Sequence, residues 1–258
     1  MINLSQAVIT TAERKPPRIV LYGQAGIGKT TFAASCPKPV IVCIEDGAGN
    51  IAVPKLYVSD WQSTMAILNA LATQEHEYKT VVIDTIDRLE AHIHAEVVSS
   101  HKSKINSIED IGYGKGYVLA LQYWEKLLKV LDVLHSKGIM TLLLAHSIVK
   151  AHNPPDGEPF DRYRLSLHDK AALRICEWAD TVIFAKYDIT TTKDGQKSKG
   201  IAGERKLFTE ERPAHWGKNR CGLPYELDFT RDVSKTLIKQ ICGINGKKKE
   251  EIVTDASN

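Results

Sequence analysis

A glycine-rich stretch near the start of the chain carries the clearest chemistry. Residues 23–30 read GQAGIGKT and satisfy the pattern G-x-x-x-x-G-K-[ST]. Its glycines let successive backbone N–H groups point at a phosphate, while Lys29 adds a mobile charge and Thr30 a hydroxyl for Mg²⁺. A glycine turn with an incidental lysine is the alternative. The predicted nucleotide-binding residues are Gly23, Gln24, Ala25, Gly26, Ile27, Gly28, Lys29, Thr30 and Thr31.

A second element of a phosphate site follows at residues 80–84, an apolar run that ends in Asp84. An Asp in this position commonly holds Mg²⁺ beside a bound nucleotide. The pattern is weak alone, but here it follows the glycine loop with one strand pattern between them. We therefore predict Thr30 and Asp84 as the metal-site residues. Asp87 fits equally well as an acidic residue in the first turn of a helix.

Two further strand patterns end in polar residues that suit catalysis. Glu45 follows the second pattern, where a carboxylate could polarise the water that attacks a γ-phosphate. His146 follows the fourth, where a polar side chain would contact that phosphate. A solvated acidic turn and a structural histidine are the alternatives. Because the chain has no [NT]-K-x-D tetrad, the pattern that reads guanine, ATP is the expected nucleotide.

The elements that must position these residues are visible as patterns of apolar residues. Near-continuous apolar runs, typical of strands buried on both faces of a parallel sheet, cover residues 18–22, 40–44, 80–84, 139–145 and 181–185. Amphipathic patterns predict helices at residues 61–72, 86–98 and 117–134. After about residue 186, a turn signal at Asp194-Gly195 predicts an antiparallel hairpin. The predicted fold class is α/β, a mostly parallel twisted sheet flanked by helices with a C-terminal antiparallel β extension.

The composition is that of an ordinary globular protein. The chain has 258 residues, of which 43% are hydrophobic and 25% charged, with a net charge of +3. This charge is too small to indicate a nucleic acid or a membrane surface by itself, so any basic site must be local. No apolar stretch approaches the roughly 20 residues that cross a bilayer. Five scattered cysteines without a C-x-x-C pair favour thiols in a reducing cytoplasm.

The two ends of the chain are polar, and residues 247–251 are a run of charge. We therefore expect an N-terminal segment at residues 1–17, a core at residues 18–232 and a charged C-terminal tail at residues 233–258. Both end segments are candidates for disorder because they offer little apolar surface to bury. No chemistry is assigned to either.

Together these features resemble the RecA-like ATPases, and more narrowly the small phage-encoded nucleotide-binding proteins that look like a RecA core and are associated with single-strand annealing. The resemblance covers roughly residues 15–230. Its more specific carriers are IGYGKGY at residues 111–117 and KNRCGLP at residues 218–224. It implies that Glu45 is the catalytic carboxylate and that His146 is the γ-phosphate sensor. RecA itself has glutamine at the sensor position.

Lys218 and Arg220 resemble the basic pair that reaches the ATP of the neighbouring subunit in RecA-like assemblies. A cation supplied in this way stabilises charge on the γ-phosphoryl group and is worth a factor of about 10³ to 10⁵ in rate. The resemblance therefore implies self-association into a ring or filament with ATP between subunits. A basic loop exposed to solvent is the alternative.

Two basic segments are predicted to bind single-stranded DNA. They are the glycine-rich stretch at residues 99–116 and the proline-rich stretch after His146, both expected as loops at places where RecA-like proteins bind DNA. Cations neutralise phosphates there, and aromatic rings stack on bases. The predicted DNA-binding residues are Lys102, Lys104, Lys115, Tyr117, Lys150, Arg162 and Arg164. Acidic neighbours reduce the positive charge of both segments, so ordinary solvated loops are the alternative. A third basic strip, which includes Arg205, fits a solvated β-ribbon better than a DNA-binding site.

We therefore expect a RecA-like ATPase that uses ATP and Mg²⁺ and acts on single-stranded DNA in phage recombination, annealing or replication support. Its predicted catalytic residues are Lys29, Glu45, His146, Lys218 and Arg220. A single-strand binding protein is a further candidate partner, and we expect no membrane to be involved. The expected location is the cytoplasm, which for a phage protein is the cytoplasm of the host cell. The alternative is a nucleotide-dependent protein that docks a replication or packaging partner with little turnover. A P-loop kinase is a third candidate. The chain shows no arginine-rich lid segment, which argues against a kinase.

Overall fold

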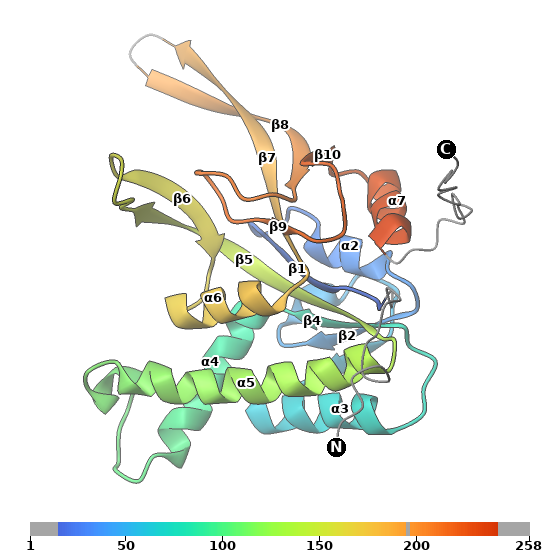
Figure 1. Ribbon diagram of the computed structural model, residues 1–258, viewed down its shortest axis with the longest axis vertical. Helices are drawn as coiled ribbons and strands as arrows, with labels where there is room; N and C mark the ends of the chain where they lie inside the picture. Colours follow the sequence, from blue (N-terminus) through green and yellow to red (C-terminus); the bar gives the residue numbers. More distant parts are fainter. Residues whose placement is uncertain (1–14, 195–196, 242–258) are drawn as a thin grey trace, which may run out of the picture.

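A mixed β-sheet runs through the molecule, with helices on both of its faces (Figure 1). The computed structural model describes residues 15–194 and 197–241. Within these ranges ten strands form one sheet in the order β10-β8-β7-β1-β5-β4-β2-β3, with β6 paired to β5 and β9 to β7. The strands are β1 (Arg18–Gly23), β2 (Pro39–Cys43), β3 (Lys55–Tyr57), β4 (Thr80–Asp84), β5 (Met140–His152), β6 (Phe160–Leu165), β7 (Thr181–Asp194), β8 (Lys197–Phe208), β9 (Lys218–Asn219) and β10 (Glu226–Asp228).

The strands from β7 through β1, β5, β4 and β2 to β3 are parallel to one another. They include all five strands that the apolar runs predict, and the α/β prediction of a mostly parallel sheet flanked by helices is confirmed. The runs are continuous because the two faces of each strand are both covered. In β1, Val20 and Tyr22 face one hydrophobic core, whereas Ile19 and Leu21 face the other.

The helices divide between the two faces of the sheet. They are α2 (Lys29–Ala34), α3 (Trp61–Thr73), α4 (Ile86–Ser100), α5 (Lys115–Ser136), α6 (Asp169–Trp178) and α7 (Arg231–Ile241), with 3₁₀ turns η1 (Asp46–Ala48) and η2 (Ile108–Ile111). Residues of α3, α4, α5 and α6 share the larger core with β1, whereas Phe32 of α2 and Leu237 of α7 belong to the smaller one. The three predicted helices are confirmed as α3, α4 and α5.

The register of the parallel strands brings their carboxyl ends to one edge of the sheet. Gly23 at the end of β1 lies opposite His146 of β5. Asp84 at the end of β4 lies opposite Leu144 of β5 and Cys43 of β2. Because β5 lies between β1 and β4, the residues that follow these strands must converge around His146. The edge therefore collects polar groups from segments that are far apart in the sequence.

The prediction of a loop after His146 is wrong. β5 continues to His152 and pairs with β6 in an antiparallel hairpin, from Ser147 opposite Leu165 to His152 opposite Phe160. The prolines that suggested a loop, Pro154 and Pro155, lie between the two strands, outside the paired residues. The segments that flank them contain β-branched and aromatic residues, which favour strands.

The predicted C-terminal antiparallel extension is confirmed, since β7 and β8 pair from Phe184 opposite Phe208 outward to Asp194 opposite Lys197. Gly195 of the predicted turn lies outside the described residues. The predicted start of the charged tail at residue 233 is wrong, because residues 233–241 belong to α7. Leu237, Ile238 and Ile241 are buried against the smaller core, an apolar spacing that the nearby charges obscure. Residues 1–14 of the predicted N-terminal segment and residues 242–258 also lie outside the described residues.

None of the described helices combines the length and the apolar character that crossing a membrane requires. No disulfide forms among the cysteines of the described ranges, which are Cys36, Cys43, Cys176 and Cys221. Burial raises the pKa of the Cys43 thiol to about 11 and that of Cys176 to about 12. These thiols are therefore protonated at neutral pH and are poor nucleophiles.

The packing of α7 gives a first prediction. Leu237 is 2% exposed, so Leu237→Ala should leave a cavity and lower the free energy of unfolding by about 2–4 kcal/mol. Lys239→Ala, an exposed position on the same helix, should change it by less than about 0.5 kcal/mol. Urea unfolding of both variants measures the difference. Equal stability of the two would show that α7 does not contribute to the core in solution.

Candidate nucleotide-binding site

The glycine loop at residues 23–30 connects β1 to α2 in a conformation that two of its glycines make possible. Gly28 has a φ of 113° immediately before α2, a value that side chains disfavour. Gly23 has no such torsion, but a Cβ there would lie 2.3 Å from the backbone oxygen of Ala185 in β7. Gly28 thus permits the turn into α2, and Gly23 lets β1 and β7 approach each other closely.

Lys29 is directed back onto this loop. Its side chain is buried, and its Nζ donates hydrogen bonds of 3.1 Å to the backbone oxygens of Gly23 and Gln24. Burial lowers the pKa of Lys29, and the carboxylates of Asp84, Asp87 and Glu45 act in the opposite direction. The ammonium group is therefore held within the loop, at the place where the motif requires a cation.

The structure brings the predicted metal-site residues together. The Thr30 hydroxyl donates a 2.8 Å hydrogen bond to Oδ2 of Asp84, which is 4% exposed. Burial raises the pKa of Asp84, whereas the Thr30 hydrogen bond and the charge of Lys29 lower it. A hydroxyl and a carboxylate are the oxygen donors that Mg²⁺ prefers, and a nearby cation would favour the ionised form of Asp84. The pair therefore fits a magnesium ion.

His146 lies between the strands that carry Gly23 and Asp84, and Asp87 fixes it there. The two carboxylate oxygens of Asp87 accept 2.8 Å hydrogen bonds, one from the His146 backbone N–H and one from its Nδ1. Burial acts to raise the pKa of Asp87, but the hydrogen bonds from His146 lower it overall. Asp87 is also in the first turn of α4, as the sequence suggested. Because Nδ1 is engaged, Nε2 is the ring nitrogen left for a ligand.

Glu45 stands at the same edge, one residue beyond Ile44 and immediately before η1. Its Oε2 accepts a 3.2 Å hydrogen bond from Nε of Arg88 on α4, a residue that sequence reasoning did not single out. Burial is the main cause of the raised pKa of Asp84, and the charge of Glu45 adds to it. With a side chain 29% exposed, Glu45 can reach water while remaining beside the site.

The two predicted trans cations lie away from the glycine loop of their own chain. Lys218 and Asn219 pair with the first residues of β7, toward the amino ends of the parallel strands. Lys218 Nζ donates to the backbone oxygens of Cys176 and Glu177, where it satisfies carbonyls at the end of α6. Arg220 is 61% exposed, with Asp180 at 3.7 Å. Arg220 is therefore the member of the pair that faces solvent.

The first group of predicted DNA-binding residues surrounds the connection from α4 to α5. Lys102, Lys104 and Lys115 are exposed. Tyr117 is engaged within the fold, because its hydroxyl donates to Glu109 at 2.6 Å and its ring stacks on His168 at 4.0 Å. Tyr113 has a φ of 54° and is fully exposed. Sequence reasoning chose Tyr117 and passed over Tyr113, which its position between two glycines could have suggested.

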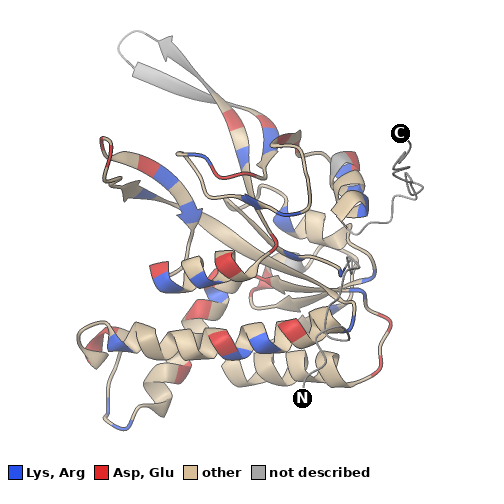
Figure 2. Ribbon diagram, viewed as in Figure 1, with Lys and Arg blue, Asp and Glu red and all other residues tan. Residues whose placement is uncertain are grey.

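The second group lies on the β5–β6 hairpin, and each of its cations already has an acidic partner. Lys150 and Arg164 contact Asp169 at 2.9 and 3.4 Å, and Arg162 contacts Glu211 at 2.6 Å. Figure 2 shows Lys and Arg interspersed with Asp and Glu along β6 and α6. The hairpin therefore carries a basic surface that the protein itself partly neutralises.

Arg205 of β8 is a site residue that sequence reasoning missed. Its Nη1 donates a 3.4 Å hydrogen bond to the backbone oxygen of Ile27 in the glycine loop, and its guanidinium lies 5.5 Å from the ring centre of Phe229. Lining a small cavity beside the loop are Gly28, Thr31, Phe32, Ser35, Arg205, Phe229, Thr230, Arg231 and Ser234. The sequence placed Arg205 in a solvated ribbon because only the pairing of β8 shows that it turns toward the loop.

A second carboxylate of α4 holds the segment that follows β6, at the base of the β5–β6 hairpin. Both oxygens of Glu90 accept hydrogen bonds from the backbone N–H of His168, at 3.1 and 3.0 Å. Ser166 N–H donates to the backbone oxygen of His146, which closes the base of the hairpin. Burial raises the pKa of Glu90 to about 7. Asp87 and Glu90, one turn apart on α4, thus hold the two sides of the hairpin base.

The glycine loop, the buried Asp84 bonded to Thr30, and a parallel sheet with β5 between their strands define a P-loop NTPase. A family model described as an AAA domain matches residues 15–221 of the chain, a range that includes all of the predicted site residues. The chain belongs to this AAA-domain family. A comparison with curated proteins gave no match.

Glu90 gives a prediction about pH. Its pKa in the folded chain, about 7, lies above the ordinary value of 4.5, so between these values the folded state keeps a proton that the unfolded state has lost. The free energy of unfolding of the wild-type chain, relative to that of a Glu90→Gln variant, should therefore fall as the pH rises from about 4.5 to about 7 and level off above that range. We expect a relative loss on the order of 2 kcal/mol between about pH 5 and pH 8, measured by urea unfolding. Glu75→Gln, at an exposed position, should show no such trend, and a flat comparison for Glu90→Gln as well would contradict the assignment.

Proposed function

We propose that this P-loop NTPase is an ATP- and Mg²⁺-dependent ATPase of the RecA-like type that acts on single-stranded DNA in phage recombination, annealing or replication support. One observation carries the proposal. At the carboxyl edge of the sheet the Thr30 hydroxyl donates a hydrogen bond to Asp84, and the charges of Lys29, Glu45 and His146 act on the same carboxylate. This is the set of groups that ATP hydrolysis requires, gathered from four separate strand ends.

The proposed mechanism assigns a task to each group. The amides of residues 23–31 and the ammonium of Lys29 bind the β- and γ-phosphates. Thr30 and Asp84 would hold Mg²⁺, which would neutralise charge on the phosphates. Glu45 orients the attacking water, and the hydrogen bond from Arg88 holds its carboxylate in place. His146 offers Nε2 to the γ-phosphate, because Asp87 occupies Nδ1.

Arg205 extends the proposed site toward the rest of the nucleotide. Its guanidinium contacts the loop at Ile27 and lies beside Phe229, and the cavity that they line reaches Thr31. A cation next to an aromatic ring provides a surface for a planar base or for ribose oxygens. We assign this position to the nucleoside side of ATP.

The connection between His146 and the β5–β6 hairpin supports a DNA-dependent reaction. His146 begins the part of β5 that extends into the hairpin, and Asp87 and Glu90 fasten the hairpin base to α4. A shift of His146 toward a bound γ-phosphate would therefore also move β6, the strand that carries Arg162 and Arg164. Self-association is proposed because exposed Arg220 lies toward the opposite ends of the strands, where it can reach a neighbouring copy but not its own glycine loop.

One observation favours the second candidate, a nucleotide-dependent protein that docks a replication or packaging partner with little turnover. The three hairpin cations predicted to contact DNA each have a carboxylate partner within 3.4 Å. Such pairing weakens the field that attracts a polyanion. DNA dependence of the ATPase activity separates the two candidates.

The first test of function compares ATP turnover with and without single-stranded DNA. We expect DNA to stimulate phosphate release by the wild-type chain and Lys29→Ala to lower it by about 100-fold or more, because the loop loses its only mobile cation. Lys129→Ala removes an exposed lysine from the solvent side of α5 and should behave as wild type. If DNA changes neither nucleotide affinity nor turnover, the docking protein becomes the better description.

The second test concerns action between subunits. Lys29→Ala and Arg220→Ala chains should each be inactive alone, since each lacks one half of every shared site. Mixed in equal amounts, they should regain part of the wild-type turnover, because some interfaces then combine an intact glycine loop with an intact Arg220. Turnover of the mixture against mixing ratio is the measurement. A mixture no more active than its components would argue against a cation in trans.

A further inference from the structure

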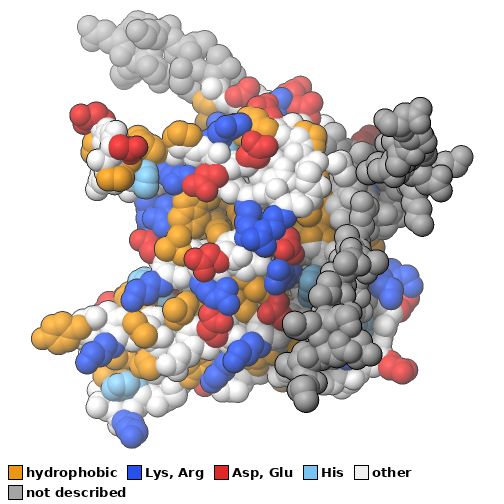
Figure 3. Space-filling model, in the orientation of Figure 1, with side chains coloured by type: hydrophobic (Ala, Val, Ile, Leu, Met, Phe, Trp, Pro, Cys, Tyr) orange, Lys and Arg blue, Asp and Glu red, His pale blue; other side chains and the backbone are white. Residues whose placement is uncertain are grey.

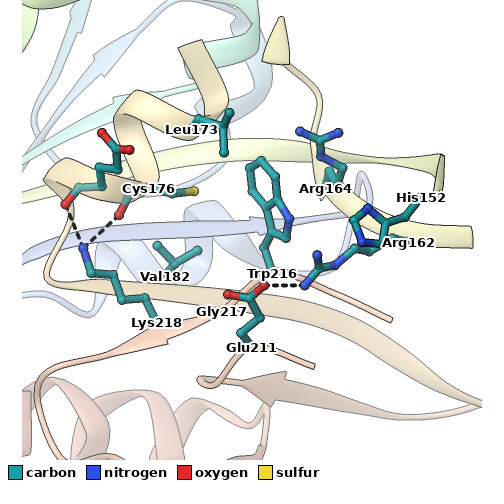
Figure 4. Close-up of a pocket in the computed structure, with 11 residues that line it drawn as sticks. His152, Arg162, Arg164, Leu173, Cys176, Val182, Glu211, Trp216, Gly217 and Lys218 are labelled. Atoms are coloured by element: carbon teal, nitrogen blue, oxygen red, sulfur yellow. Dashed lines mark hydrogen bonds and ion pairs between the residues drawn. The ribbon is translucent and has the colours of Figure 1, made fainter. Parts of the chain in front are cut away.

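A cavity of about 550 Å³ lies apart from the nucleotide site, between β6, α6 and the segment that leads into β9. Figure 4 shows Trp216 at its centre, with Arg162 and Arg164 on one side and Val182 and Lys218 on the other. On the face shown in Figure 3, apolar side chains lie among Lys and Arg in the region between the hairpin and α6. We call it the Trp216 cavity, and its lining is His152, Arg162, Arg164, Leu173, Cys176, Glu177, Val182, Glu211, Trp216, Gly217 and Lys218.

The apolar part of the lining is suited to a flat ring. Leu173 is 51% exposed although most other apolar side chains of α6 are buried, and Trp216 is only partly buried. The guanidinium of Arg164 lies over the indole ring, 4.3 Å from its centre, so it covers one face of the indole with a second planar group. A planar ligand can stack against this surface and bury apolar area that is otherwise in water.

The polar part of the lining carries hydrogen-bond donors and acceptors together. Arg162 is 8% exposed, and across the described ranges neither its Nε nor that of Arg164 has a hydrogen-bond partner although both are buried. Glu211 accepts from Arg162 at 2.6 Å, and Glu177 supplies a second carboxylate. The cavity therefore offers donors and acceptors side by side. A nucleobase edge also carries both kinds of group, whereas a bare phosphate or an acidic peptide would be opposed by the two carboxylates.

We propose that the Trp216 cavity receives one unstacked base of a single-stranded nucleic acid, stacked on the pair formed by Trp216 and Arg164, with its polar edge toward Arg162 and Glu211. The proposal rests on the proposed function for its substrate and adds a base-reading anchor on a segment outside both predicted DNA loops. The cavity is connected to the nucleotide edge, because Arg162 and Arg164 belong to the strand paired with the extension of β5 that begins at His146.

Binding of a fluorescent single-stranded oligonucleotide, followed by anisotropy with ATP present, tests the proposal. Trp216→Ala should weaken binding about 5- to 100-fold, the loss expected for one stacked base, and Trp216→Phe should recover most of it. Leu173→Asp changes an exposed residue of the same cavity and should also weaken binding, so the test does not depend on one variant that could fail to fold. Tyr57→Ala removes a 56% exposed ring on β3, at the other edge of the sheet, and should have no effect.

An abasic oligonucleotide of the same length separates base from phosphate contacts. Wild-type and Trp216→Ala chains should bind it equally, because it has no base to stack. If Trp216→Ala weakens abasic and ordinary oligonucleotides alike, the indole acts only through the fold and the proposal is wrong.

Three further outcomes would also overturn it. If wild type binds DNA and Trp216→Ala and Leu173→Asp bind it as tightly, the cavity has no part in binding and only this inference fails. If those variants keep DNA affinity but lose self-association in sedimentation, the cavity belongs to an interface with a second copy. A wild-type chain that binds no oligonucleotide with or without ATP would instead remove the proposed DNA substrate, and this inference with it.

Discussion

The hydrogen bond between the Thr30 hydroxyl and the Asp84 carboxylate joins the end of one strand to a turn 54 residues earlier in the chain. Asp84 is buried, and a buried carboxylate is costly unless it is neutralised, hydrogen-bonded or paired with a cation. The sheet order must therefore set β4 two places from β1, and the register must end both strands at the same level. The close contact of Gly23 with β7 and the placement of His146 between the two strands follow from the same constraint.

α4 connects this edge to the outer parts of the molecule. Asp87 and Glu90 are one turn apart, and each satisfies a backbone N–H at the base of the β5–β6 hairpin. From the other side of the sheet, Arg205 brings β8 into contact with the glycine loop. Both hairpins are thus fastened to the nucleotide edge by specific polar contacts rather than by apolar packing alone. Polar contacts of this kind are directional, so they fix the hairpins more precisely than burial would.

The sequence was sufficient for elements whose cause is local. The central strands, three long helices and the convergence of Lys29, Thr30 and Asp84 follow from apolar periodicity and from motif spacing. It was insufficient where a side chain's surroundings depend on distant pairing. Neither the turn of Arg205 toward Ile27 nor the stacking of Arg164 on Trp216 can be read from spacing, because each needs the register of strands joined late in the chain. The prolines between β5 and β6 also suggested a loop, so the hairpin was not predicted although its strands contain β-branched residues.

The two strands that flank β1, β5 and β7, both extend beyond the parallel part of the sheet. β5 continues six residues past His146, about 20 Å, and β7 continues nine residues past Ala185, about 30 Å. Each extension is paired with an antiparallel return strand and begins next to the phosphate-binding turn, because His146 and Ala185 both lie opposite Gly23. Such an arm amplifies angle into distance, since a tilt of about 5° at the pivot of β7 moves its far end by about 2.5 Å. The two hairpins therefore project from the nucleotide edge of the sheet, and a sub-ångström shift at that edge would become a displacement of atomic size at their tips.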